Sequence, residues 1–236
     1  MYKRQATYRA TSFLDARALQ PQQVLVEYNI NQLVRIFSSN TELGELGLIF
    51  HIGHCGSTLL SRALSTSDAF LPVREPLPLL VLSNLFRELD KPTCFLSKPQ
   101  FESLKQCIVN ALKRRFNPDQ LSVIKLNSTC NNLIAPLLDD GAKRRAVCLY
   151  LPLESYLTSM LSKDKLSSDV RGQAITRMQA WMQIEDVKPL QLHALNPIQL
   201  MVVAWLTNLY QFTRASTEQS NQVKLLNFED FLGAPE

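Results

Sequence analysis

The stretch Leu46–Leu64, LGLIFHIGHCGSTLLSRAL, predicts the fold of this 236-residue chain. It opens with an apolar run typical of a buried strand, and it closes with leucines and an alanine at helical spacing. Between them, Gly53 and Gly56 bracket a short polar loop. Glycines let successive backbone N–H groups point at one spot, and the N-terminus of the next helix adds unpaired N–H groups and a positive dipole end. Strand, loop and helix in this order predict a phosphate-binding loop.

Six consecutive residues make up this predicted phosphate loop, and we expect them to hold an anion: Gly53, His54, Cys55, Gly56, Ser57 and Thr58. The alternative is a plain glycine turn between a strand and a helix. The ATP form of the loop, G-x-x-x-x-G-K-[ST], is not matched, because no lysine follows Gly56 and only two residues separate the glycines. The loop is therefore not expected to hold ATP or GTP with magnesium.

The remaining pattern is one of apolar strands that alternate with helices. Further strands are predicted at residues 69–73, 121–126, 146–151 and 223–228, and helices at 23–38, 77–89, 101–112, 130–138, 152–161, 173–185 and 198–214. Near-continuous apolar strands indicate a mainly parallel sheet that helices cover on both faces. We expect a lead-in with one helix over residues 1–45 and a three-layer, P-loop-type α/β domain over 46–236. The helix at 198–214 should be buried nearly all round, and no closing helix is expected after the last strand.

Composition narrows the class of protein. Hydrophobic residues are 46% and charged residues 19%, which is ordinary for a soluble globular domain. The net charge of +4 favours an anionic cofactor but does not indicate a nucleic-acid partner. The five cysteines are widely spaced and form no C-x-x-C, so we expect reduced thiols in a cytoplasmic protein and no metal site. Neither a signal peptide nor an apolar run of about 18 residues is found, and no membrane span is expected.

Several polar residues follow predicted strands directly. Glu75, Asn127 and Pro152 each come just after a strand, as the phosphate loop does. Ligands of parallel sheets bind at the carboxyl ends of the strands, so these positions are expected to share one crevice. Arg62 and Arg74 are interpreted as surface or packing residues.

The loop resembles that of the sulfotransferases, enzymes that use 3′-phosphoadenylyl sulfate. The segment from His54 to Thr58 occupies the place of the family's basic residue followed by Ser-Gly-Thr-Thr or Ser-Gly-Ser-Thr. Three later segments are similar to family motifs in the right order. Residues 123–127 resemble the strand that ends Ile-Lys-Thr-His, residues 150–159 the Arg-Asp-Pro-Arg-Asp corner, and residues 225–236 the late strand Leu-Arg-Tyr-Glu-Asp-Leu.

The resemblance assigns roles to individual residues. Lys125 matches the lysine that faces the transferred sulfuryl group, and His54 stands where a cation contacts the leaving phosphate. Asn127 falls at the place of the family's catalytic histidine but cannot take a proton, so we take Glu75 as the candidate base. From the residues alone, other readings stay open. Lys125 can form an ion pair with Glu75 or Asp139, Glu75 can be a helix N-terminal acid, and His54 can bond to backbone.

A second group of positions concerns the 3′-phosphate of the donor. Thr158 and Ser159 fall at and beside the serine that holds this phosphate in the family. Tyr150 replaces the family's arginine, which removes a bidentate charged contact. The glycine-rich basic segment that follows in the family has no counterpart before Glu236, which leaves a truncated C-terminus open.

The resemblance implies a soluble, bacterial-type sulfotransferase that moves a sulfuryl group to a hydroxyl or amine of a small-molecule or glycan acceptor. It implies 3′-phosphoadenylyl sulfate as co-substrate and requires no metal. The alternatives are a nucleotide-dependent kinase or NTPase, and a catalytically degenerate relative that binds a nucleotide or partner. The sequence names neither the acceptor nor an oligomeric state.

Overall fold

The computed structural model describes residues 9–11, 13–14, 29–38, 45–139, 144–162, 170–184 and 186–233. Its centre is a five-stranded sheet in which every pair of neighbours is parallel, in the order β2-β3-β1-β4-β5. The strands are β1 (Leu46–His51), β2 (Phe70–Arg74), β3 (Leu121–Lys125), β4 (Arg144–Tyr150) and β5 (Val223–Asn227). Ile49 of β1 lies beside Lys125 of β3 and Val147 of β4, so the strand that leads into the phosphate loop is the middle one.

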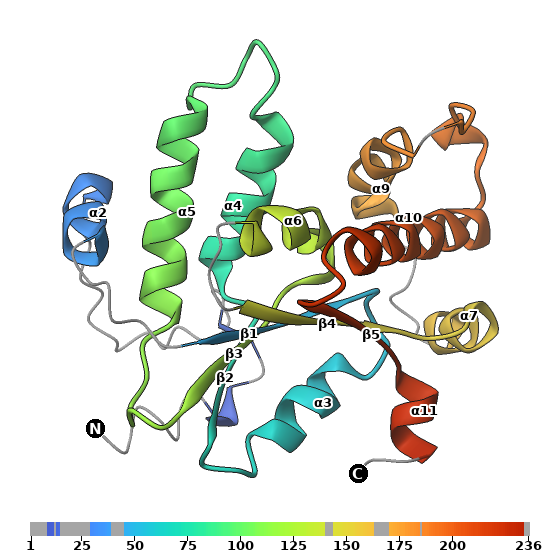
Figure 1. Ribbon diagram of the computed structural model, residues 1–236. Coiled ribbons are helices and arrows are strands. Elements are labelled where there is room, and N and C mark those ends of the chain that lie inside the picture. Colours follow the sequence, from blue (N-terminus) through green and yellow to red (C-terminus); the bar gives the residue numbers. More distant parts are fainter. Residues whose placement is uncertain are drawn as a thin grey trace, which may run out of the picture.

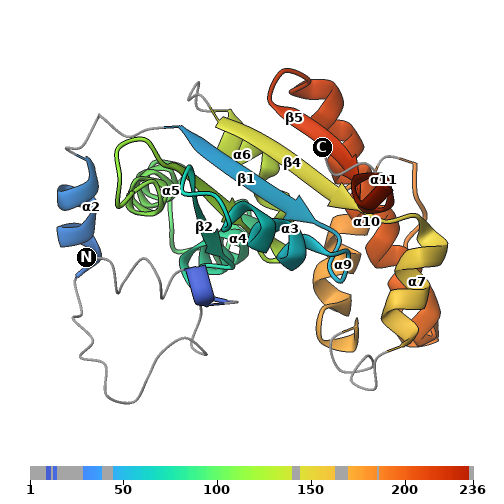
Figure 2. The same cartoon turned by 90° about the horizontal axis from the view of Figure 1, so that it is seen from below.

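Helices cover both faces of this sheet, which confirms the α/β class and the three predicted layers (Figure 1). The helices are α2 (Ile30–Ser38), α3 (Ser57–Leu64), α4 (Leu77–Glu88), α5 (Lys98–Leu112), α6 (Ile134–Leu138), α7 (Leu153–Leu161), α9 (Ala174–Trp181), α10 (Pro197–Glu218) and α11 (Phe228–Gly233), with 3-10 turns η2 (Ser128–Leu133) and η3 (Leu192–Ala194). Helices α4, α5, α6, α9 and α10 lie on one side, while α3 and α11 lie on the other, which faces the viewer in Figure 2.

The apolar strand runs form the core. Phe50, Ile124, Cys148 and Leu149 are almost fully buried in the three central strands, between the two helical layers. Each buried side chain of this size contributes about 1.5–3 kcal/mol relative to an exposed one. Burial on both faces explains why these strands read as continuous rather than alternating apolar runs.

Two helices begin earlier than the predicted ranges, and side chains cap both of these N-termini. Helix α5 begins at Lys98, where the Ser97 hydroxyl accepts from the Gln100 N–H and the Gln100 side chain accepts from the Ser97 N–H. Helix α10 begins at Pro197 under the same kind of capping box from Asn196 and extends to Glu218.

Three expectations about elements need correction or fall outside the structure. The expectation that α10 is buried nearly all round is wrong, because Ile198 and Leu206 are exposed while only the opposite face packs on the core. A closing helix does exist: α11 follows β5 directly, and Asn227 Oδ1 accepts from the Glu229 N–H at its start. Most of residues 1–28 and of the polar segment 162–172 lie outside the described residues.

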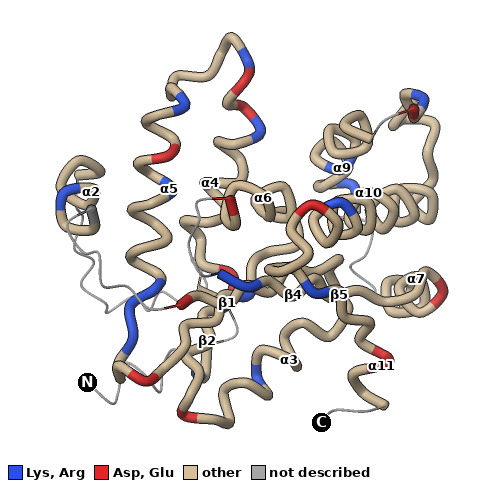
Figure 3. Tube along the Cα trace, in the orientation of Figure 1, with Lys and Arg blue, Asp and Glu red and all other residues tan. Residues whose placement is uncertain are grey.

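Charged side chains are spread over the molecule rather than gathered on one face (Figure 3). Arg62 is exposed, whereas Arg74 is fully buried and ties β2 to α3 through Ser61 Oγ at 3.0 Å and through Ser65 Oγ. Arg74 is thus a packing residue. Among the described helices, none combines the length and the apolar character that a membrane span requires.

Candidate anion-binding and transfer site

The phosphate loop leaves the centre of the sheet in a strained, left-handed course. Gly53, His54 and Gly56 have φ of 79°, 50° and 82°, and α3 starts at the next residue. Gly56 is the N-cap of α3 and offers no side chain to its first turn. The first N–H groups of that helix therefore have no side-chain cap and, with the helix dipole, form a place where an anion is stabilised.

Gly56 is fixed by its neighbour as well as by its backbone angle. A Cβ at this position would lie 2.2 Å from Cζ of Phe228, the buried first residue of α11. Glycine is therefore required here on two counts, conformation and space. Phe228 belongs to α11, the helix that the sequence analysis did not predict, and its ring packs against the phosphate loop at Gly56.

A buried histidine supports the loop from the end of β1. His51 Nε2 lies 2.9 Å from the Leu126 carbonyl oxygen, and His51 Nδ1 accepts from the Gly53 N–H at 3.0 Å. These partners require a proton on Nε2 and none on Nδ1. Burial, and then the positive charge of Lys125, hold the pKa of His51 well below its usual value. His51 is thus a neutral, structural residue.

The segments that follow β3 and β4 flank the loop. Ser128 at the start of η2 packs against Gly53, with Oγ 3.3 Å from the position of an added Cβ. On the other side, Ser159 Oγ donates to the His54 carbonyl at 3.1 Å, while Thr158 is exposed. Of the two residues expected to hold the 3′-phosphate, Ser159 is thus already bonded to the loop.

Glu75, Lys125 and Asn127 meet at the carboxyl ends of β2 and β3. Lys125 Nζ forms an ion pair with Glu75 Oε1, and Asn127 Nδ2 donates to Glu75 Oε2 at 3.1 Å. The side chains of Lys125 and Glu75 are only 2% and 11% exposed, and the ring of Phe13 covers the Lys125 ammonium at 5.6 Å. The open alternative of an ion pair for Lys125 is therefore realised with Glu75.

The backbone at Glu75 adds to this picture. Its φ of 48° is rare for a residue with a side chain, and such conformations cluster at functional sites. The Glu75 N–H donates to the Lys125 carbonyl at 2.7 Å, which fixes the two residues to each other by backbone and side chain. Burial lowers the pKa of His51 at the end of β1, and the positive charge of Lys125 lowers it further.

The other predicted loop residues divide by exposure. The His54 side chain is exposed and Thr58 is half-buried, whereas Ser57 is buried. Cys55 is fully buried, with Sγ 3.6 Å from the Leu149 carbonyl oxygen. Burial raises the pKa of this thiol to about 11, so Cys55 has only its backbone to offer an anion.

A pocket opens beside the first half of the loop, between η2, α7, α9 and α10. Its enclosed volume is about 40 Å³, the rest of the space is open to solvent, and both apolar and polar groups line it. The lining residues are Ile52, Gly53, His54, Ser128, Tyr156, Met160, Val170, Gln173, Ala174, Arg177, Leu200, Met201 and Ala204. Arg177, the one cationic side chain of α9, is 8% exposed in this wall.

Arg177 and His51 are the site residues that sequence reasoning missed. The signal for Arg177 was available: Ala174, Arg177, Met178 and Trp181 fall at spacings of one helix face, and a cation on an apolar face is unusual. His51 sits inside an apolar strand run, where nothing in the sequence distinguishes a support for the loop from a core residue.

The residues present fit the phosphosulfate end of the implied donor, 3′-phosphoadenylyl sulfate, better than its 3′-phosphate. The uncapped start of α3 and the Lys125 charge suit a phosphosulfate group. At the end of β4, Tyr150 is half-buried against the core and offers one neutral donor where the family has an arginine. Within the described ranges, no cluster of His, Cys, Asp and Glu side chains is arranged to hold a metal ion.

Comparison with solved structures finds similar chains. The solved "Sulfotransferase Domain from the Curacin Biosynthetic Pathway" aligns with 81% of this chain and 69% of its own, at a TM-score of 0.49 and 15% sequence identity. No family model and no curated protein sequence matches the chain.

Proposed function

We propose that this protein is a sulfotransferase that binds 3′-phosphoadenylyl sulfate at the phosphate loop and transfers the sulfuryl group to a hydroxyl or amine. One observation carries the proposal: an uncapped helix start without the lysine of ATP loops follows β1, and the neighbouring strand β3 ends in a buried lysine that is paired with a carboxylate. Sulfuryl transfer, like phosphoryl transfer, needs mainly positioning and charge stabilisation, which such an arrangement supplies.

Each group has a role in the proposed reaction. The N–H groups of the loop and of α3 hold the phosphosulfate, His54 contacts the leaving phosphate, and Lys125 stabilises charge on the sulfuryl oxygens. The acceptor oxygen forms a bond to sulfur while the bridging S–O bond breaks. The bridging oxygen leaves with the electron pair on adenosine 3′,5′-bisphosphate. The proton of the acceptor passes to the Glu75 carboxylate, which acts as general base.

A second candidate is a relative that binds the nucleotide without catalysis. It is favoured by the state of Glu75, whose two oxygens are already bonded to Lys125 and Asn127. In this reading the buried pair is a scaffold element, and Tyr150 reflects a site that no longer requires tight binding of the 3′-phosphate.

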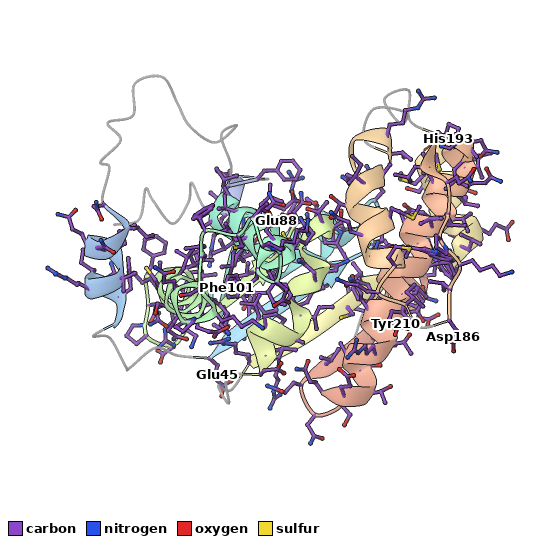
Figure 4. The ribbon with its side chains drawn as sticks, turned by 90° about the horizontal axis from the view of Figure 1, so that it is seen from above. Glu45, Glu88, Phe101, Asp186, His193 and Tyr210 are labelled. Carbon is purple, nitrogen blue, oxygen red and sulfur yellow. The ribbon has the colours of Figure 1, made fainter. Side chains whose placement is uncertain are left out.

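Binding measurements distinguish a protein that binds the sulfuryl donor from one that binds ATP. We expect adenosine 3′,5′-bisphosphate to bind by calorimetry and to stabilise the protein by about 2.7 kcal/mol at 100-fold over its dissociation constant. ATP with magnesium should not bind. His54→Ala should weaken the bisphosphate, whereas His193→Ala should not, because His193 is exposed beside the outer end of α10 (Figure 4). Binding of ATP with magnesium alone would replace the proposal by the kinase-like alternative.

A measurement of turnover distinguishes an enzyme from a protein that only binds the nucleotide. Glu75→Gln should lower the release of adenosine 3′,5′-bisphosphate from the donor, in the presence of a panel of hydroxyl and amine acceptors, by about 10²–10⁴-fold. Its affinity for the bisphosphate should change little. Glu88→Gln is the matched control, an α4 glutamate paired with Lys91 at 2.7 Å, and it should keep full turnover (Figure 4). Tight binding without turnover in the wild type would favour the second candidate.

A further inference from the structure

Arg177 is a buried cation that lacks an acidic partner among the described residues. Its Nη1 donates to Asn208 Oδ1 at 2.8 Å and to the Ser128 carbonyl at 3.3 Å. Its Nη2 donates to Gln173 Oε1 at 3.1 Å and to Ser128 Oγ at 3.4 Å. All of these acceptors are neutral, and the buried Nε has no acceptor at all in the described part of the chain.

The charge on Arg177 persists in spite of burial. Desolvation lowers the pKa of its guanidinium to about 10, which leaves it protonated at neutral pH. A buried charge is ordinarily paired, because removal from water without a counter-charge is costly. An anion in the pocket would supply that counter-charge.

The pocket is separate from the anion cradle at the start of α3. Gly53 and His54 belong to its wall, but no residue from Cys55 to the end of α3 does. A ligand in the pocket therefore lies beside the donor site and shares a wall with it. The placement suits an acceptor, which must lie beside the donor; Lys125 and Glu75 are not among the residues that line the pocket.

The other side chains that line the pocket indicate what kind of ligand body it can hold. Tyr156 and Met160 come from α7, and Leu200 and Met201 from α10, so these parts of the wall are apolar or aromatic, whereas Ser128 and Gln173 beside the guanidinium are polar. Ligand sites of this kind bind an apolar body through their walls and fix its orientation through a few polar groups.

We infer that this pocket binds an acceptor with an apolar body and a carboxylate, and that Arg177 recognises the carboxylate. The inference rests on the proposed function in one respect: the ligand is an acceptor only if the protein transfers a sulfuryl group. The binding of the acid itself does not depend on it. Arg177 acts here as a specificity-determining residue.

The test uses matched acids and amides and needs no sulfuryl donor. The probes are para-hydroxybenzoate, para-hydroxyphenylacetate and para-hydroxyphenylpropanoate, each compared with its primary amide by calorimetry on the full chain. At least one acid should bind tenfold or more tightly than its amide, as expected for a charge-assisted bond. Arg177→Met should abolish that preference and leave amide binding nearly unchanged.

Arg87 provides the control for a purely structural role. It holds η2 from the other side, donating to the Thr129 carbonyl at 3.0 Å and Ser83 Oγ at 2.9 Å, and it does not line the pocket. Arg87→Met should keep the acid preference of the wild type, and thermal unfolding should show that both variants are folded. Arg177→Lys checks the same point if the methionine variant fails to fold, since it keeps the charge and should keep part of the preference.

Three results would overturn the inference. The first is a wild type with no preference for any acid over its amide, including no binding of either. The second is an equal loss of acid and amide binding in Arg177→Met. The third is competition between the acid and saturating adenosine 3′,5′-bisphosphate, which would place the carboxylate in the nucleotide site. Failure of the bisphosphate to bind, with acid binding intact, would reject only the proposed function.

Discussion

Gly56 combines a left-handed backbone with an aromatic ring in contact, and both exclude a side chain. We expect Gly56→Ala to lower the free energy of unfolding by about 2–4 kcal/mol, from backbone strain and overpacking together. Urea denaturation measures this change. Gly172→Ala is the control, because Gly172 has no atom within 4 Å of an added Cβ and should change stability by less than about 1 kcal/mol.

A double-variant cycle tests whether Phe228 is the cause. In a Phe228→Ala background the clash is gone, so the cost of Gly56→Ala should shrink to the backbone component alone. An unchanged cost would show that the ring yields without strain and that conformation accounts for the whole effect.

His51 makes stability depend on pH. Its folded pKa is lowered, so below the ordinary value of about 6.5 the unfolded chain binds a proton that the folded chain does not. The free energy of unfolding should be full above pH 6.5 and fall by up to about 1.4 kcal/mol per pH unit below it. Urea titrations at a series of pH values measure the slope. His51→Gln should flatten it between about pH 6.5 and 5, and His193→Gln should not; a flat wild-type profile would refute the assignment.

Contacts between side chains can be predicted from the sequence only where both residues lie at the ends of neighbouring strands. Glu75 and Lys125 follow or end neighbouring strands, so the sequence alone places their ion pair among the alternatives. The Arg177 contact with Asn208 joins two helices whose relative placement no local pattern specifies. The burial of Cys55 likewise depends on which way the phosphate loop turns, which its composition does not determine.

At the scale of elements, capping decides where the long helix α10 begins. The Asn196 side chain accepts from the Gln199 N–H at 2.9 Å, and the Gln199 side chain accepts from the Asn196 N–H. Asn196→Ala should lower the free energy of unfolding by about 1 kcal/mol, and Asn196→Asp should retain most of it. Chemical denaturation of both variants measures the difference, and equal loss in both would show that the cap bond does not matter.

Strands were predicted more reliably than short helices, for a physical reason. A strand buried on both faces is apolar at nearly every position, so β3 and β4 stand out in the sequence. Helix α11 is six residues long and buries Phe228 alone, which is too short for a helical period to appear. Its signals were the capping Asn227 and the acidic first turn, Glu229 and Asp230.

At the scale of the molecule, the sheet divides into a protected centre and two edges. β1 is paired on both sides, whereas β5 is paired only with β4 and exposes Lys224 and Leu225. We expect backbone amides of β1 to exchange with solvent only on global unfolding, and those of β5 at least tenfold faster. Hydrogen exchange with mass spectrometry measures both strands in one experiment. Equal protection would mean that α10 and α11 shield the edge as well as a strand does.

The N-terminal helix should behave as a separate unit in the same experiment. α2 is tied to α5 through the Asn110 amide, which donates to the Phe37 carbonyl at 2.8 Å, and to the segment just after α5 through Arg114, which lies over the Phe37 ring. Because no described strand contacts α2 closely, its opening need not disturb the sheet. Its amides should exchange faster than those of α5; slower exchange would place α2 within the cooperative core.

The contacts of the phosphate loop also bear on the order in which the chain folds. Ser128, Ser159 and Phe228 each reach the loop from a segment that follows a different strand, and Phe228 lies close to the C-terminal end. During synthesis on the ribosome, the loop emerges well before Phe228 and cannot take its final shape until β5 and α11 have docked. Contacts so distant in sequence make folding slow. The shape of the phosphate loop would therefore report on the docking of α11.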